Sequence, residues 1–145
     1  MQVPTSVEPG LDFVTTATLI VADVGRSTAF YRDVLGADVL RTGEPTFLRL
    51  GNLWLTINVG GGPTDDKPDV TATPPRNTHD LSFFLNLRVS DIRRFYERWR
   101  SRGATFITEP KVHAHELRCY IRDPDGYLIE VGQTTFTATP LELYR

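Results

Sequence analysis

Three side chains with useful chemistry share one predicted β-hairpin near the end of the chain. Arg118 and Tyr120 lie in an alternating run before Asp123-Pro124-Asp125-Gly126, and Glu130 lies in a second alternating run after that sequence. An Asp-Pro-Asp-Gly sequence between two such runs predicts a hairpin turn. Because side chains alternate along a strand, the guanidinium, the phenol and the carboxylate fall on one face. Together they could bind the polar end of a ligand, or Glu130 could act as a general base with the other two as polarising donors.

The other face of this hairpin is apolar. It carries Cys119, Ile121, Ile129 and Val131, which we expect to face the core. Cys119 is the only cysteine, so an internal disulfide and a cysteine-rich metal site are excluded. Its place on the apolar face favours an inert buried thiol over a nucleophile.

The three histidines give little further evidence of a metal site. His113 and His115 stand two residues apart, so both rings point to one side of an extended segment and could bind a metal. The alternative is a pair of exposed loop histidines, which we favour. His79 precedes the next predicted strand and shares no pattern with them.

The elements that position these residues come from an internal repeat. Each half of the chain has an apolar strand ending at Asp, an amphipathic helix, a Gly, and further strands. The matching pieces are Val21-Ala22-Asp23 with Val89-Ser90-Asp91, Phe30-Tyr31 with Phe95-Tyr96, and Leu35-Gly36-Ala37 with Arg102-Gly103-Ala104. The chain is predicted to be an α+β protein built from two tandem βαβββ modules.

The predicted boundaries follow from this repeat. Strands are expected over residues 13–22, 47–50, 53–59, 83–89, 117–122 and 127–133, and helices over 27–35, ended by Gly36, and from Asp91 to Gly103. A single domain over residues 13–133 then contains module 1 (13–59), a Gly- and Pro-rich loop (60–80) and module 2 (81–133). Residues 1–12 form a flexible start and residues 134–145 a tail, or an arm on a partner subunit.

Strand alternation also predicts a ligand cavity. One face of each strand is apolar and suits a helix cover: Leu19, Val21, Leu53, Leu55, Ile57, Phe83, Leu85, Leu87, Val89, Ile129 and Val131. The opposite faces mix aromatic and hydrogen-bonding groups: Thr16, Thr18, Phe47, Arg49, Trp54, Thr56, Asn58, Phe84, Asn86, Arg88, Arg118, Tyr120 and Glu130. This mixture is typical of a small-molecule cavity, and the alternative is a solvent-exposed sheet face.

Composition narrows the class of partner. The chain has 145 residues and a net charge of −2, so nothing in its charge favours nucleic acid or a membrane surface. It has no apolar run of membrane-spanning length, and its first ten residues lack an apolar signal core. We expect a cytoplasmic protein that binds neither nucleic acid nor membrane.

The motifs together resemble the vicinal oxygen chelate superfamily, which includes glyoxalase I, fosfomycin- and bleomycin-resistance proteins and extradiol dioxygenases. The resemblance rests on residues 21–36, on Phe47-Leu48-Arg49-Leu50-Gly51-Asn52-Leu53-Trp54-Leu55, and on residues 118–131. It implies paired βαβββ modules forming a cupped mixed sheet, and a homodimer. It also implies that Tyr120 matches a substrate-contacting tyrosine of the fosfomycin-resistance branch.

The same resemblance implies metal ligands on the first and last strands of each module in the metal-dependent members. Here the corresponding positions hold Thr16, one of Trp54, Thr56 and Asn58, and one of Ser82, Phe84 and Asn86. Only Glu130 offers a ligand side chain, so we expect no tightly bound divalent metal. Three functions stay open: a metal-independent small-molecule-binding protein, an enzyme using Glu130, Tyr120 and Arg118, and a non-catalytic interaction module.

Overall fold

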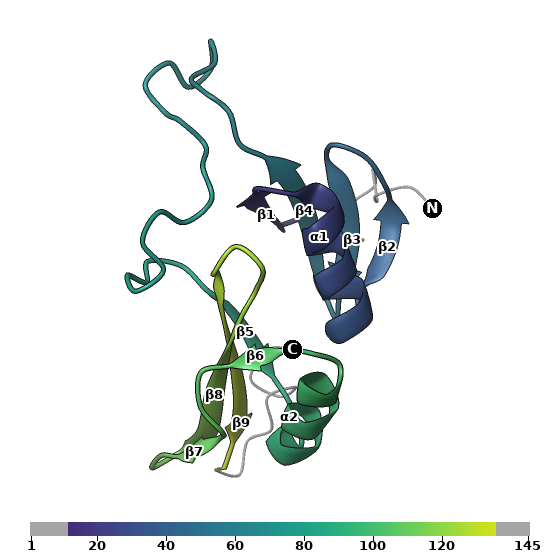
Figure 1. Cartoon of the computed structure of the whole chain (residues 1–145), viewed down its shortest axis with the longest axis vertical. Coiled ribbons are helices and arrows are strands. Elements are labelled where there is room, and N and C mark those ends of the chain that lie inside the picture. The colour runs from purple at the N-terminus through teal and green to yellow at the C-terminus, as the bar shows by residue number, and fades with distance from the viewer. Residues whose placement is uncertain (1–11, 136–145) are drawn as a thin grey trace. The chain divides into compact units, whose positions relative to one another are not determined.

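The computed structural model describes residues 12–135, and the chain divides into two compact units, Met1–Arg76 and Asn77–Arg145 (Figure 1). Each unit has one strand, then a helix, then further strands, which confirms the predicted α+β class and the repeated order of the two modules. The first unit is βαβββ, and the second has one strand more after its helix. In each unit the first strand pairs in parallel with the last strand, and the other pairs are antiparallel.

The first unit has a four-stranded sheet in the order β1-β4-β3-β2. Its elements are β1 (Thr16–Val21), α1 (Val24–Ala29), the π-helical turn η1 (Phe30–Val34), β2 (Asp38–Arg41), β3 (Thr46–Leu50) and β4 (Leu53–Val59). The helix lies across one face of this sheet (Figure 1). Alternation buries Leu19, Leu55 and Ile57, and Tyr31 is fully buried among the core side chains.

The second unit has a sheet in the order β5-β9-β8-β6, with β7 paired beside β8. Its elements are β5 (Leu85–Arg88), α2 (Ile92–Ser101), β6 (Thr105–Phe106), β7 (Lys111–Val112), β8 (Glu116–Arg122) and β9 (Leu128–Thr134). Asp91 caps α2 as predicted, since its carboxylate accepts from the Arg94 amide at 3.1 Å. The apolar hairpin face is buried as predicted: Cys119, Ile121, Ile129 and Val131 are at most 2% exposed.

Several element boundaries differ from the predictions. The first helix begins at Val24, three residues before the predicted start, because the Asp23 side chain accepts from the Arg26 amide and caps it. β1 begins at Thr16 and β5 at Leu85, later than predicted. Phe83 therefore lies outside the strand and is 62% exposed, so its placement on the apolar face was wrong.

The segment between β4 and β5 contains no helix or strand, and only isolated bridges such as Gly61 with Ala72. The predicted single domain over 13–133 stays a prediction. The predicted flexible start and tail lie outside the described residues, except for Asp12, Thr134 and Thr135, and Thr134 belongs to β9. Within residues 12–135 no helix is long and apolar enough to cross a membrane.

Candidate functional site

The turn of the β8–β9 hairpin sets the register of the candidate site. The Asp123 side chain accepts from the backbone amides of Asp125 and Tyr127, each at 2.9 Å. Gly126 closes the turn at φ +90°, a conformation that favours glycine. The register that results places Tyr120 directly opposite Glu130 on the polar face, as strand alternation predicts.

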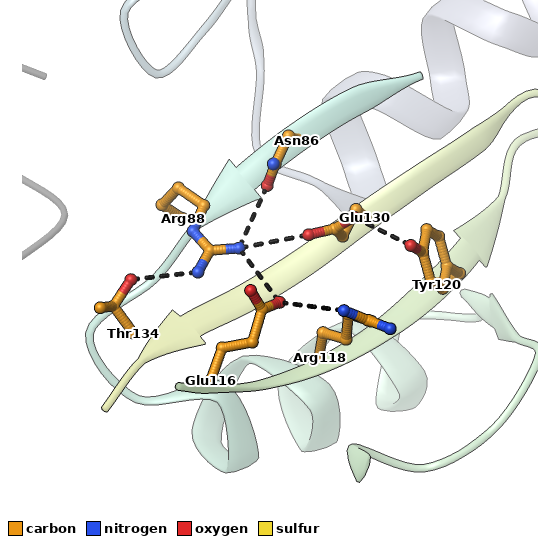
Figure 2. Close-up of polar contacts among 7 residues, drawn as sticks. All are labelled: Asn86, Arg88, Glu116, Arg118, Tyr120, Glu130 and Thr134. Carbon is orange, nitrogen blue, oxygen red and sulfur yellow. Dashed lines mark hydrogen bonds and ion pairs between the residues drawn. The ribbon is translucent and has the colours of Figure 1, made fainter. Parts of the chain in front are cut away.

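Glu130 belongs to a polar network on this face and joins Arg88 to Tyr120 (Figure 2). Its Oε1 atom accepts from Arg88 Nη1 at 3.2 Å, and its Oε2 atom accepts from the Tyr120 hydroxyl at 2.9 Å. The pair is largely withdrawn from solvent, because 13% of the Arg88 side chain and 10% of the Glu130 side chain are exposed. Both carboxylate oxygens are thus engaged by the protein itself.

Arg88 makes its further contacts with protein groups as well. Its Nη2 atom donates to the Thr134 hydroxyl at 3.1 Å, and its Nη1 atom lies 3.5 Å from the Asn86 side-chain oxygen. The Glu116 carboxylate lies 3.7 Å from the same Nη1 atom. These contacts come from β5, β8 and β9, so the guanidinium ties three neighbouring strands together (Figure 2).

Arg118 differs from Arg88 in being open to solvent. Its side chain is 40% exposed, and the ion pair described for it is a long one, 3.9 Å to Glu116 Oε1. That Glu116 oxygen is buried and accepts no hydrogen bond from the described residues, although two guanidinium groups lie near it. The face therefore presents a solvent-accessible guanidinium beside a buried carboxylate oxygen that accepts no hydrogen bond from the described residues.

Tyr120 serves as a hydrogen-bond donor here. Its pKa is raised above the ordinary value, first because burial disfavours the phenolate, and then because the hydroxyl donates to the Glu130 carboxylate. The ring of Phe84 meets that of Tyr120 edge-on, with centroids 6.2 Å apart.

On the opposite face, burial raises the pKa of the Cys119 thiol to about 11, so it stays protonated at neutral pH and is a poor nucleophile.

The predicted ligand-binding residues of the first unit lie on one face of its sheet. Thr16 and Arg49 lie on either side of Trp54 of β4 as its register partners. Phe47 pairs with Thr56, two residues farther along β4. The Arg49 guanidinium makes a 2.7 Å ion pair with Asp38, and the Asn58 side chain accepts from the Val59 amide at 3.0 Å. Arg49 and Asn58 thus already have protein partners.

The second unit brings together six of the predicted residues: Phe84, Asn86, Arg88, Arg118, Tyr120 and Glu130. All of them except Phe84 are drawn in Figure 2. Sequence reasoning missed three others that belong to the same face, namely Glu116, Gly132 and Thr134. Strand alternation could have identified Glu116 and Thr134, because Glu116 lies two residues before Arg118 and Thr134 lies four residues after Glu130. Glu116 and Thr134 were missed because the strands were expected to begin at residue 117 and end at residue 133, whereas Gly132 lies inside the predicted strand and has no side chain to identify it.

Comparison with known proteins identifies the family. The sequence profile of the Glyoxalase/Bleomycin resistance protein/Dioxygenase superfamily matches residues 10–131. The chain belongs to this superfamily. The resemblance read from the sequence motifs is thereby confirmed.

Individual relatives agree with the superfamily assignment. The chain is similar to the metallothiol transferase FosB of Shouchella clausii, at 29% identity over 81% of this chain and 77% of that protein. It is similar to the lactoylglutathione lyase of Salmonella typhimurium, at 30% identity over 78% and 86%.

Solved structures show the same fold. A glyoxalase/bleomycin resistance protein/dioxygenase from Nocardioides superposes with a TM-score of 0.68 at 21% identity, covering 91% of each chain. The fosfomycin resistance protein FosX from Mesorhizobium loti superposes with a TM-score of 0.60 at 21% identity, covering 88% of this chain and 96% of that one.

The metal that the superfamily resemblance implies does not fit the residues of this chain. Parallel pairing places Thr16 beside Trp54 in the first unit and Asn86 beside Glu130 in the second. Among residues 12–135 no group of three His, Cys, Asp or Glu side chains could hold a metal ion, whereas zinc sites use at least three protein ligands. His113 and His115 are exposed, as the favoured alternative predicts.

Proposed function

We propose that the chain binds an amphipathic small molecule that carries an oxyanion or a carbonyl, on the polar face of β5, β9 and β8. Arg118, Tyr120 and Glu130 meet the polar end of the ligand, and Phe84 packs against its apolar body. For the first unit, the ligand-binding role predicted for Trp54, Phe47, Thr16, Arg49 and Asn58 stays a prediction.

The observation that carries this proposal is the contrast between the two arginines of the face. Arg88 is 13% exposed and donates to Glu130 and Thr134, whereas Arg118 is 40% exposed and has only a 3.9 Å ion pair described for it. Guanidinium donors recognise carboxylate and phosphate geometry well. Arg118 is therefore the group that supports an anionic or carbonyl ligand.

A second candidate function is catalysis, in which Glu130 removes a proton and Tyr120 and Arg118 polarise the substrate. It is favoured by relatives named as a metallothiol transferase and a lactoylglutathione lyase. Against it, both Glu130 oxygens already accept hydrogen bonds from protein groups and the side chain is only 10% exposed, so a substrate proton could reach only the lone pairs that these bonds leave. Binding without chemistry is the function that the geometry supports better.

The proposal is tested with a panel of ligands in calorimetric titrations, with and without divalent metal. The panel includes fosfomycin, bleomycin and lactoylglutathione, together with simple carboxylates and phosphonates. For any ligand that binds, Arg118→Gln is expected to weaken the affinity by about 1–3 kcal/mol, because a charge-assisted hydrogen bond is lost. Arg93→Gln, which changes an exposed arginine on α2, is the matched control and is expected to bind like wild type.

Glu130→Gln separates the two functions, because it keeps the side-chain volume and removes the charge. If Glu130 only binds the ligand, the variant is expected to lose about 1–3 kcal/mol of binding free energy, and there is no turnover to measure. If Glu130 is a catalytic base, the turnover of the variant is expected to fall about 100-fold or more while the ligand still binds. If no ligand of the panel binds, or if Arg118→Gln and Glu130→Gln bind as tightly as Arg93→Gln, the ligand site has been assigned to the wrong face.

We also propose that the chain forms a homodimer. Each small unit has a sheet that ends in edge strands, β1 and β2 in the first and β5 and β6 in the second, and edges of this kind are commonly completed by a partner. Sedimentation velocity at micromolar concentration is expected to give one species with the mass of two chains. A monomeric mass across that range contradicts the proposal.

A further inference from the structure

Arg88 occupies the part of the site where the superfamily resemblance places a cation. Asn86 and Glu130 are direct neighbours on β5 and β9, the strands expected to supply metal ligands in the second module. The Arg88 guanidinium lies over the same two strands, 3.2 Å from the Glu130 carboxylate and 3.5 Å from the Asn86 oxygen. The positive charge next to Glu130 thus comes from the chain itself.

The backbone under Arg88 is shaped to hold it. Gly132 is its register partner on β9, and a Cβ atom at that position would lie 1.9 Å from Arg88 Nη1 and 2.6 Å from Cζ. Only a residue without a side chain leaves room for the guanidinium to lie flat on the strand. Thr134, on the same face of β9, accepts from the other terminal nitrogen at 3.1 Å.

Charge in the network is balanced without any added ion. Two guanidinium groups, Arg88 and Arg118, face two carboxylates, Glu116 and Glu130, at distances of 3.2 to 3.9 Å. A divalent cation at Glu130 would meet the Arg88 guanidinium at close range in a site withdrawn from water, where like charges repel strongly. A divalent cation at Glu130 would therefore bind against this repulsion or would have to displace Arg88.

We propose that Arg88 is the built-in cation of this site and takes the place of a divalent metal as the counter-ion of Glu130. The inference rests on the proposed function in taking this face as the ligand site. It deepens that function, because the ligand is then recognised by fixed side chains alone: Arg118 donates to it, the Tyr120 oxygen, whose proton goes to Glu130, can accept from it, and Arg88 fixes the Glu130 carboxylate. Arg88 is a positioning residue, since its described contacts are with protein groups.

The first test measures metal directly. Protein purified without chelator is expected to contain well below one equivalent of zinc, manganese, nickel or iron by elemental analysis. Neither a chelator nor millimolar Mn²⁺, Zn²⁺ or Ni²⁺ is expected to shift its melting temperature, because binding to the native state would raise it. Stoichiometric metal that is lost in Glu130→Gln overturns the inference.

The second test removes the guanidinium. Arg88→Met is expected to lower the melting temperature by about 10 °C, because it leaves a buried carboxylate without its partner. Arg118→Met is the matched control on the same face and is expected to shift it by only about 2 °C, since its ion pair is long and exposed. Arg88→Lys keeps the positive charge without the forked donors of arginine. Its melting temperature is expected to lie between those of Arg88→Met and the wild type.

The double variant Arg88→Met/Glu130→Gln decides whether the two residues act on each other. If Arg88 is the counter-ion of Glu130, the double variant melts at a higher temperature than Arg88→Met alone. If Arg88→Met does not fold, a folded double variant supports the inference in the same way. Equal losses in Arg88→Met and Arg118→Met, or a double variant no more stable than Arg88→Met, overturn it.

These outcomes separate the inference from the proposed function. If the Arg88–Glu130 coupling is measured but no ligand of the panel binds, the result supports the built-in cation and contradicts the proposed ligand-binding function. If a ligand binds only when a divalent metal is added, the result supports the proposed function and contradicts the built-in cation.

Discussion

Replacing Gly132 by Ala is expected to lower the free energy of unfolding by about 3 kcal/mol, because the Arg88 guanidinium is displaced from a largely buried carboxylate. The added Cβ would lie 1.9 Å from Arg88 Nη1. Since that atom is the end of a flexible side chain, the arginine can move away, and the main cost is the lost ion pair with Glu130. Urea unfolding followed by far-ultraviolet circular dichroism measures the change.

Two controls isolate this cause. Gly62→Ala adds the same methyl group where no atom lies within 4 Å, and it is expected to leave stability unchanged within about 0.5 kcal/mol. In an Arg88→Met background the guanidinium is absent, so Gly132→Ala is expected to cost less than it does in the wild type. A Gly132→Ala variant as stable as Gly62→Ala shows that the guanidinium does not lie against this strand.

Much of the hairpin could be predicted from alternation alone. A strand has a period of two, so the identity of the buried residues Cys119 and Ile129 fixes the face of Tyr120 and Glu130. The same rule failed at Phe83, because β5 begins two residues later, and alternation says nothing where there is no strand. The boundaries of an element limit this reasoning more than its period does.

Short elements carried too little signal to be predicted. β2 has four residues with Asp38 and Arg41 at its ends, and β6 and β7 have two residues each. Such strands form because a longer neighbour offers free backbone groups, which is a property of the sheet rather than of their own composition. The start of the first helix was placed too late because its apolar positions begin only at Phe30, whereas the Asp23 cap starts the helix at Val24.

The roles of the arginines could not be predicted from sequence. Alternation places Arg88 and Arg118 on the polar face, but it does not say which of them is paired with a carboxylate. That choice depends on the register between β5 and β9, which sets Arg88 beside Gly132, two residues from Glu130. The sequence therefore identified a group of polar residues, and the structure separated the engaged cation from the available one.

A buried side chain supports the hairpin turn that holds Tyr120 opposite Glu130. Asp123 is 5% exposed, and its Oδ1 atom accepts from two backbone amides, those of Asp125 and Tyr127, at 2.9 Å each. Gly126 donates its amide to the Asp123 carbonyl at 3.0 Å and completes the turn. Loss of this carboxylate therefore affects the turn and the two strands of the candidate site together.

Asp123→Ala is expected to lower the free energy of unfolding by about 3–4 kcal/mol, because two part-buried backbone amides lose this charged acceptor. Asp123→Asn is the matched control: it keeps an oxygen at the same position and is expected to cost about 1 kcal/mol, the difference between a charged and a neutral acceptor. Urea unfolding measures both changes, and hydrogen exchange is expected to be faster at the amides of residues 125 and 127 in Asp123→Ala. For a ligand bound by Tyr120 and Glu130, Asp123→Ala also weakens the affinity, because the strands that present these groups are less firmly registered. If Asp123→Ala is as stable as Asp123→Asn, the turn is held by its backbone alone, and the hairpin does not depend on this carboxylate.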